Sequence, residues 1–160
     1  MNGVEYAKLV AAYILKNFGD RGIQVYREIN VGKSIIGKGR RIDLFLVAND
    51  GGPAFAIECK HQAVSGTTDE KIPYALEDMK AVGVAGCIVY AGDGFSKGVL
   101  HLLQASEIAA YCLPEREGLA CSRHTRELDH MLAIHFEWWD VLVSHRSVFD
   151  LEEWRSESTD

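Results

Sequence analysis

The stretch Ile42-Asp-Leu-Phe-Leu-Val47, followed after a short linker by Ala54-Phe-Ala-Ile-Glu-Cys-Lys60, decides the fold. Both segments are short, mostly apolar and rich in residues that favour strands, which predicts two β-strands. The linker Asn49-Asp-Gly-Gly-Pro53 contains an Asp-Gly pair, a strong signal for a tight hairpin turn. The sequence therefore predicts an antiparallel hairpin of strands at 42–47 and 54–60.

Three charged side chains interrupt these apolar strands. Asp43 lies near the start of the first strand, and Glu58 and Lys60 lie near the end of the second. Residues i and i+2 of a strand point to the same face, so Glu58 and Lys60 project together. Because a hairpin places the start of one strand beside the end of the other, Asp43 is expected to lie next to them. Two carboxylates and one ammonium group thus converge at one end of a sheet.

Carboxylates within apolar strands are disfavoured unless they are paired or bind a metal ion. Two carboxylates at close range repel each other, and a divalent cation with a preference for oxygen ligands, Mg²⁺ or Mn²⁺, relieves that repulsion. Such an ion activates water and offsets charge on a phosphate, and Lys60 would add electrostatic stabilisation. The alternative without catalysis is a cross-strand salt bridge between Asp43 and Lys60, with Glu58 solvated.

The flanking segments predict a mixed α/β sheet with helices on its faces. Apolar residues at helical spacing predict a helix over residues 3–18, and alternation over residues 23–31 predicts a strand. Beyond the hairpin we expect a helix at about 73–82, a buried strand at 85–91, a helix at 96–104, a strand at 108–112 and a final helix at about 124–143.

Asp43 together with Glu58-Cys59-Lys60 resembles the PD-(D/E)XK nuclease motif, although Arg41-Ile42, and no proline, precedes Asp43. The expected element order over about residues 3–91 is similar to the αβββαβ core of that restriction-endonuclease-like superfamily. The resemblance implies Mg²⁺-dependent cleavage of DNA, with Asp43 and Glu58 as metal ligands. It also implies that the Cys59 carbonyl is a further ligand and that Lys60 orients or helps to activate the attacking water.

Two further residues resemble positions that some members of the superfamily add to this motif. Glu5, in the helix ahead of the sheet, matches a helix glutamate that joins the metal site. Gln62, two residues after Lys60, matches a glutamine that supports catalysis. The resemblance implies that both residues belong to the active site.

The net charge of −6 argues against a nucleic-acid partner until its distribution is considered. Residues 150–160 hold five acids and one base, so the rest of the chain carries only −2. The glycine-rich segment 31–42 contains no acid and four bases: Lys33, Lys38, Arg40 and Arg41. Local charge decides phosphate contact. We therefore expect a flexible hairpin connection that binds DNA; the alternative is a solvated loop.

The chain of 160 residues fits one domain, with a core at about 3–112, a C-terminal helical extension at about 122–150 and an acidic tail at 150–160. The final helix has a wide apolar surface, which predicts core burial or a homodimer or higher homo-oligomer that cuts both strands of a duplex. No apolar run is long enough for a membrane span and no signal peptide is recognised, so we expect no membrane partner and a cytoplasmic location. The four scattered cysteines indicate buried thiols more than a zinc site.

Together these features predict a Mg²⁺- or Mn²⁺-dependent endonuclease that hydrolyses phosphodiester bonds in double-stranded or branched DNA. The alternatives are a catalytically inactive or regulatory DNA-binding member of the same fold, a DNA junction resolvase or homing endonuclease, or an unrelated α/β domain with a coincidental motif.

Overall fold

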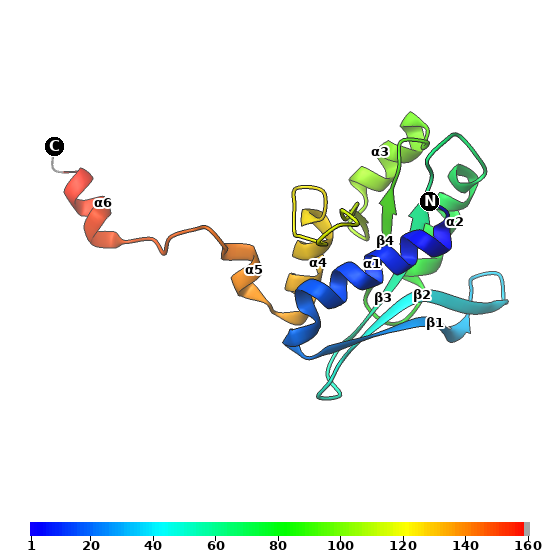
Figure 1. Cartoon of the computed structure of the whole chain (residues 1–160), viewed down its shortest axis with the longest axis horizontal. Coiled ribbons are helices and arrows are strands. Elements are labelled where there is room, and N and C mark those ends of the chain that lie inside the picture. The colour runs from blue at the N-terminus through cyan, green and yellow to red at the C-terminus, as the bar shows by residue number, and fades with distance from the viewer. Residues whose placement is uncertain (159–160) are drawn as a thin grey trace.

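Five strands form one mixed sheet in the order β1-β2-β3-β4-β5, in a computed structural model that describes residues 1–158 (Figure 1). The first three strands are antiparallel neighbours, whereas β4 and β5 run parallel to β3. The predicted mixed α/β fold is confirmed, with the restriction-endonuclease-like order of elements. The strands are β1 (Ile23–Lys33), β2 (Gly39–Ala48), β3 (Ala54–His61), β4 (Gly86–Ala91) and β5 (Ala109–Tyr111).

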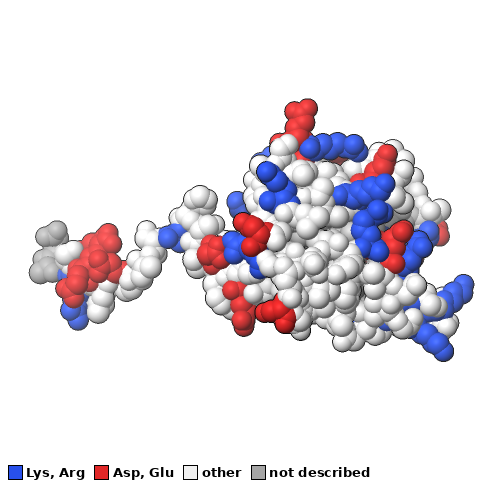
Figure 2. Space-filling view, turned by 60° about the horizontal axis from the view of Figure 1, so that its bottom comes forward, with Lys and Arg blue, Asp and Glu red and all other residues white. Residues whose placement is uncertain are grey.

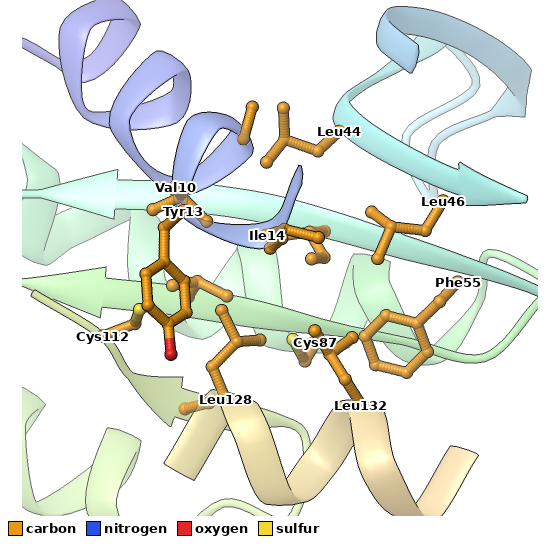
Figure 3. Packing of buried hydrophobic residues seen from close by; sticks show 14 of the residues in the cluster. Val10, Tyr13, Ile14, Leu44, Leu46, Phe55, Cys87, Cys112, Leu128 and Leu132 are labelled. Atoms are coloured by element: carbon orange, nitrogen blue, oxygen red, sulfur yellow. The ribbon is translucent and has the colours of Figure 1, made fainter. Parts of the chain in front are cut away.

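Helices cover both faces of this sheet. On one face, α1 (Gly3–Phe18) and α4 (Arg126–Phe136) bury a large apolar cluster against the strands (Figure 3). On the other face, α2 (Thr68–Lys80) and α3 (Lys97–Ala105) enclose a smaller cluster. Removal of this apolar surface from water is the main term that stabilises the layers. The fully buried side chains of the larger cluster include Val10, Tyr13, Ile14, Leu44, Leu46, Cys87, Cys112, Leu128 and Leu132.

The helix expected from about residue 73 begins earlier, at Thr68, and contains Pro73 in its interior. The prediction treated proline as the start of the helix because the ring removes an N–H donor. Pro73 lies in the second turn of α2, so the helix loses the one hydrogen bond that an N–H at this position would donate. The N–H groups of the first turn have no partner within a helix in any case. The short turn expected at residues 69–71 is therefore part of α2.

The single helix expected at about 124–143 is also corrected: it is two helices, α4 and α5 (Trp139–Val143). Glu137 ends α4 in the left-handed conformation, with φ of 61°. This break lets Trp138 turn inward, where its ring stacks between Phe18 at 5.1 Å and Phe136 at 5.0 Å. The apolar residues have helical spacing throughout this region, but burial of the Trp138 ring separates the region into two helices.

The chain beyond α5 leaves the sheet and ends in the short helix α6 (Leu151–Glu157), which stands apart from the body in Figure 1. In the segment between α5 and α6, apolar side chains are exposed to solvent: Val148 is 93% exposed and Phe149 is 75% exposed. Among the described residues, no helix has both the length and the hydropathy that a membrane crossing requires.

Candidate active site

Asp43 lies where the regular pairing of β2 with β3 stops. The last backbone pair on this side joins Leu44 to Ile57. One residue further on, the Asp43 Oδ2 atom accepts the backbone N–H of Cys59 at 2.8 Å. A side-chain carboxylate thus takes the place of a backbone carbonyl at the end of the ladder. This bond fixes Asp43 beside the segment that carries Glu58 and Lys60.

Glu58 and Lys60 lie on one face of β3, as their spacing predicts. The Lys60 Nζ atom donates to Glu58 Oε1 at 2.7 Å, so Lys60 pairs with Glu58 in the structure and not with Asp43. Burial raises the pKa of the Glu58 carboxyl, and the nearby charge of Asp43 raises it further, whereas Lys60 opposes the shift. The site therefore contains a half-buried carboxylate whose negative charge is incompletely compensated.

Two hollows meet at this cluster and share Arg41, Glu58 and Lys60. One is a groove of about 380 Å³ between the β1–β2 hairpin and α2, which we call the hairpin groove. The other, of about 350 Å³, lies at the first turn of α1 and is also lined by Asp43. The charged cluster thus borders both hollows.

Glu5 lies at the start of α1 but forms a helix cap there. The Asn2 side chain accepts the Glu5 N–H at 2.9 Å, and Glu5 Oε2 accepts the Asn2 N–H at 2.8 Å. This reciprocal pair is a capping box, which satisfies two N–H groups of the first turn. Within residues 1–158, no three His, Cys, Asp or Glu side chains converge as ligands for a metal ion. The structure therefore does not bring Glu5 together with Asp43 and Glu58.

Asp43 in the first half of β2 and Glu58 near the end of β3 nevertheless fit a divalent cation such as Mg²⁺. Mg²⁺ commonly binds one or two protein carboxylates and completes its octahedron with water and substrate phosphate. Asp43 and Glu58 supply that number, and the backbone of Cys59 lies between Glu58 and Lys60 in the same strand. A divalent cation would also compensate the charge on the half-buried Glu58 carboxylate.

Gln62 is not directed at this cluster. Its side chain is 5% exposed, and its Nε2 atom donates to Asp69 Oδ1 and to the Gly94 carbonyl, both at 2.8 Å. These bonds join the end of β3 to the first turn of α2 and to the loop after β4. In this structure the Gln62 side chain thus connects the end of β3 to α2 and to the loop after β4.

The four bases expected to bind DNA divide into two groups. Lys33, Lys38 and Arg41 are exposed on the β1–β2 hairpin, whereas Arg40 is buried at 6% exposure. The Arg40 guanidinium donates from Nε and NH2 to the two carboxylate oxygens of Asp78, at 3.0 and 2.9 Å. Arg40 therefore contacts α2 instead of solvent, which corrects its assignment as a phosphate ligand. Arg41 lies 3.5 Å from a carboxylate oxygen of Glu28.

The sequence analysis missed residues that complete the hairpin groove. Lys71, Tyr74 and Asp78 all line it from α2. Their spacing of i, i+3 and i+7 places them on one face of a helix. The sequence alone therefore indicates that they share a face, but not that this face lines a groove. Glu28 was also missed; it lines the second hollow in the left-handed conformation, with φ of 55°. Nothing in its residue type indicates that conformation.

Comparison with known proteins gives one family and several structural neighbours. A profile of the PD-(D/E)XK nuclease superfamily domain matches residues 2–139. Similar solved structures include a protein of unknown function, with 16% identity and a TM-score of 0.44 over 68% of this chain. A type III CRISPR defence DNA nuclease activated by cyclic oligoadenylate has 19% identity and a TM-score of 0.46 over 82% of this chain. A repair endonuclease from Pyrococcus abyssi has 19% identity and a TM-score of 0.35 over 61% of this chain.

This chain spans 56%, 20% and 42% of the lengths of those three proteins, respectively. No curated protein matches its sequence.

Proposed function

This chain belongs to the PD-(D/E)XK nuclease superfamily, and on that premise we propose that it is a Mg²⁺-dependent endonuclease of double-stranded or branched DNA. The observation that carries the proposal is the cluster formed by the first half of β2 and the end of β3. There Asp43 is fixed by the Cys59 N–H, and Glu58 lies half-buried beside Lys60. Mn²⁺ is the expected substitute, since both ions prefer oxygen ligands.

In this proposal Asp43 and Glu58 hold the metal ion, with the Cys59 carbonyl as a further ligand. When bound, the ion supplies Lewis-acid stabilisation of the phosphate and lowers the pKa of a water molecule. Lys60 leaves its bond with Glu58 and directs its ammonium group at the attacking water or the phosphate oxygens. Glu5 remains in the helix cap in this proposal, because joining the site would break the hydrogen bond that its carboxylate accepts from the Asn2 N–H.

Substrate binding falls to the hairpin that rises beside the cluster. Lys33, Lys38 and Arg41 provide exposed positive charge, and Arg41 also lines both hollows at the site. Figure 2 shows basic side chains projecting at the end of the molecule opposite to its acidic C-terminal helix. We assign the contacts of these bases to the phosphate backbone, which positions DNA without reading its sequence.

A cleavage assay tests this proposal. The purified chain is incubated with supercoiled plasmid, linear duplex, single-stranded DNA, a four-way junction and RNA, with Mg²⁺, Mn²⁺ or EDTA. We expect metal-dependent nicking of duplex or branched DNA, which Asp43→Asn and Lys60→Ala each reduce at least about 100-fold while circular dichroism stays unchanged. Full activity in either variant contradicts the assignment.

The same assay separates the principal alternative, a DNA-binding member of the fold that lacks catalysis. That alternative predicts tight DNA binding with EDTA present and no product with any metal ion. Selective cutting of the four-way junction would instead identify a junction resolvase.

We also propose that the chain acts as a homodimer, because cleavage of both strands of a duplex requires two active sites. Exposed apolar side chains on α4 and α5 support this proposal: Ile134 is 59% exposed, Trp139 53% and Val143 59%. Light scattering of the purified chain measures its mass directly, and a monomer with and without DNA contradicts the proposal.

A further inference from the structure

Asp78 is the point at which α2 holds the basic hairpin. Its carboxylate accepts three hydrogen bonds from that hairpin: from the Ile35 N–H at 3.0 Å, and from Arg40 Nε and NH2 at 3.0 and 2.9 Å. The Arg40 side chain is 6% exposed and that of Asp78 is 16% exposed. Such a two-point pair between a planar guanidinium and a carboxylate fixes orientation as well as distance.

The rest of the hairpin is held by the pairing of β1 with β2 and of β2 with β3, and its tip projects beyond the last β2–β3 pair. Its tip is closed by two bonds of its own, from the Ser34 N–H to the Lys38 carbonyl at 2.7 Å and from the Gly37 N–H to the Ser34 carbonyl at 2.9 Å. At the tip Ile36 is 62% exposed, so burial there contributes little. The bonds to Asp78 are therefore the contacts best placed to set the angle of the hairpin relative to α2.

That angle matters because the hairpin and the charged cluster border the same groove. Lys38, Arg41, Glu58 and Lys60 all line the hairpin groove, and Asp78 lines its α2 side. A shift of the hairpin would change the separation between the phosphate-binding bases and the site of cleavage.

We propose that Asp78 is a positioning residue for nucleic-acid binding: by fixing Arg40 and Ile35 it holds Lys33, Lys38 and Arg41 at the place where a bound strand crosses the active site. This inference rests on the proposed function, because it assigns a phosphate backbone as the ligand of the hairpin. Arg40, although basic, acts through the hairpin and does not touch the ligand.

The competing explanation is a buried ion pair that contributes only to stability. The two explanations differ in how binding depends on salt. Each phosphate contact that is lost lowers the slope of log affinity against log salt by about 0.9 for duplex DNA. A general loss of stability lowers the folded fraction at every salt concentration and leaves that slope unchanged.

The test compares Asp78→Asn with Glu77→Gln, its neighbour in α2, which pairs with Lys80 on the surface. Both substitutions remove one negative charge from the same helix, so net charge alone predicts a slight gain in DNA affinity for both. Binding of a fluorescent duplex to the metal-free protein is measured by anisotropy over a series of salt concentrations. We expect Asp78→Asn to weaken binding about tenfold at moderate salt and to lower the slope by about 1 to 2, whereas Glu77→Gln matches the original chain.

Three outcomes overturn the inference: an unchanged slope in Asp78→Asn, a steeper slope with tighter binding because released Arg40 contacts phosphate, or no duplex binding by the original chain. If Asp78→Asn does not fold, Arg40→Lys serves instead, since it keeps the charge but loses the two-point contact. We expect a smaller loss of slope in Arg40→Lys, and an unchanged slope again contradicts the inference. Because binding is measured without metal, absence of cleavage leaves this result intact, and the two proposals fail separately.

Discussion

At the scale of single residues, strand periodicity was sufficient to place the charged cluster. Glu58 and Lys60 share a face because they are two residues apart in β3, and the turn after β2 brings Asp43 beside them. Side-chain partners did not follow from the sequence, because they depend on contacts with distant elements. Arg40 is the clearest example: Asp78, its partner, lies 38 residues away in α2. A count of basic residues in the hairpin cannot distinguish this buried pair from a surface charge.

The placement of Glu5 leads to a prediction about metal binding. Because glutamine can replace glutamate in a capping box, Glu5→Gln should change the free energy of unfolding by less than about 0.5 kcal/mol. It should also leave Mn²⁺ affinity within about twofold, a change well under 1 kcal/mol, because Glu5 is assigned to the cap. Titration calorimetry with Mn²⁺ and thermal unfolding measure the two quantities.

Asp43→Asn serves as the matched control, since it is also a loss of one carboxylate and should weaken Mn²⁺ binding at least about tenfold. A loss in Glu5→Gln as large as that in Asp43→Asn would show that Glu5 leaves the cap to bind metal. In that case the helix glutamate implied by the family resemblance is restored to the site.

At the scale of elements, all five strands and the first and third helices were predictable because their apolar patterns are regular. The later break between α4 and α5 was not, since Trp138 is placed by two aromatic rings, one of which, Phe18, lies 120 residues earlier in the chain. The loop after β4 is another segment for which the sequence predicted only part of what the structure shows. Its glycines signal a turn in the sequence, but the structure shows that they permit close contact between backbones.

Gly92 makes the closest of these backbone contacts, and this contact leads to a prediction about stability. Its φ is +107°, and a Cβ atom would lie 2.2 Å from the Gln62 carbonyl oxygen. Gly92→Ala should therefore destabilise the fold by about 2–4 kcal/mol, through an unfavourable backbone conformation and a direct clash. Because the same contact supports the end of β3, cleavage by the folded fraction should fall as well. Urea denaturation measures the first effect.

Gly98 provides the control for that measurement. It lies in α3, and a Cβ atom there would meet nothing within 4 Å. Gly98→Ala should stabilise the chain by about 0.5–1 kcal/mol, since glycine is a poor helix former. Equal denaturation midpoints for the two variants would show that the close contact at Gly92 is not maintained in solution.

At the scale of the whole molecule, one group of acidic side chains lies on α6, at the end of the long axis opposite to the basic hairpin (Figures 1 and 2). The body between them carries side chains of both signs. The sequence already indicated this arrangement, because a net charge of −6 includes −4 within residues 150–160. What the sequence did not indicate is that the described part of the acidic tail and the three residues before it, residues 147–158, are exposed throughout. If the chain binds DNA as proposed, we expect the tail to act on that ligand through its electric field more than through packing.

Removal of residues 147–160 tests this view of the tail. Because the described part of the segment is exposed, its loss should leave the midpoint of thermal unfolding unchanged within about 1 °C, in contrast to the several degrees expected from a loss of 1 kcal/mol. The net charge of the chain becomes −2, so repulsion of DNA decreases and affinity should rise about three- to tenfold at low salt. The gain should vanish at high salt, where the Debye length falls to about 3 Å. A full-length variant with amides in place of the acids at 150, 152, 153 and 157 isolates the charge, and it should reproduce the truncated chain. If truncation instead lowers the unfolding midpoint while the amide variant does not, the apolar side chains of the tail are packed in solution, and the field of the tail is not its main contribution.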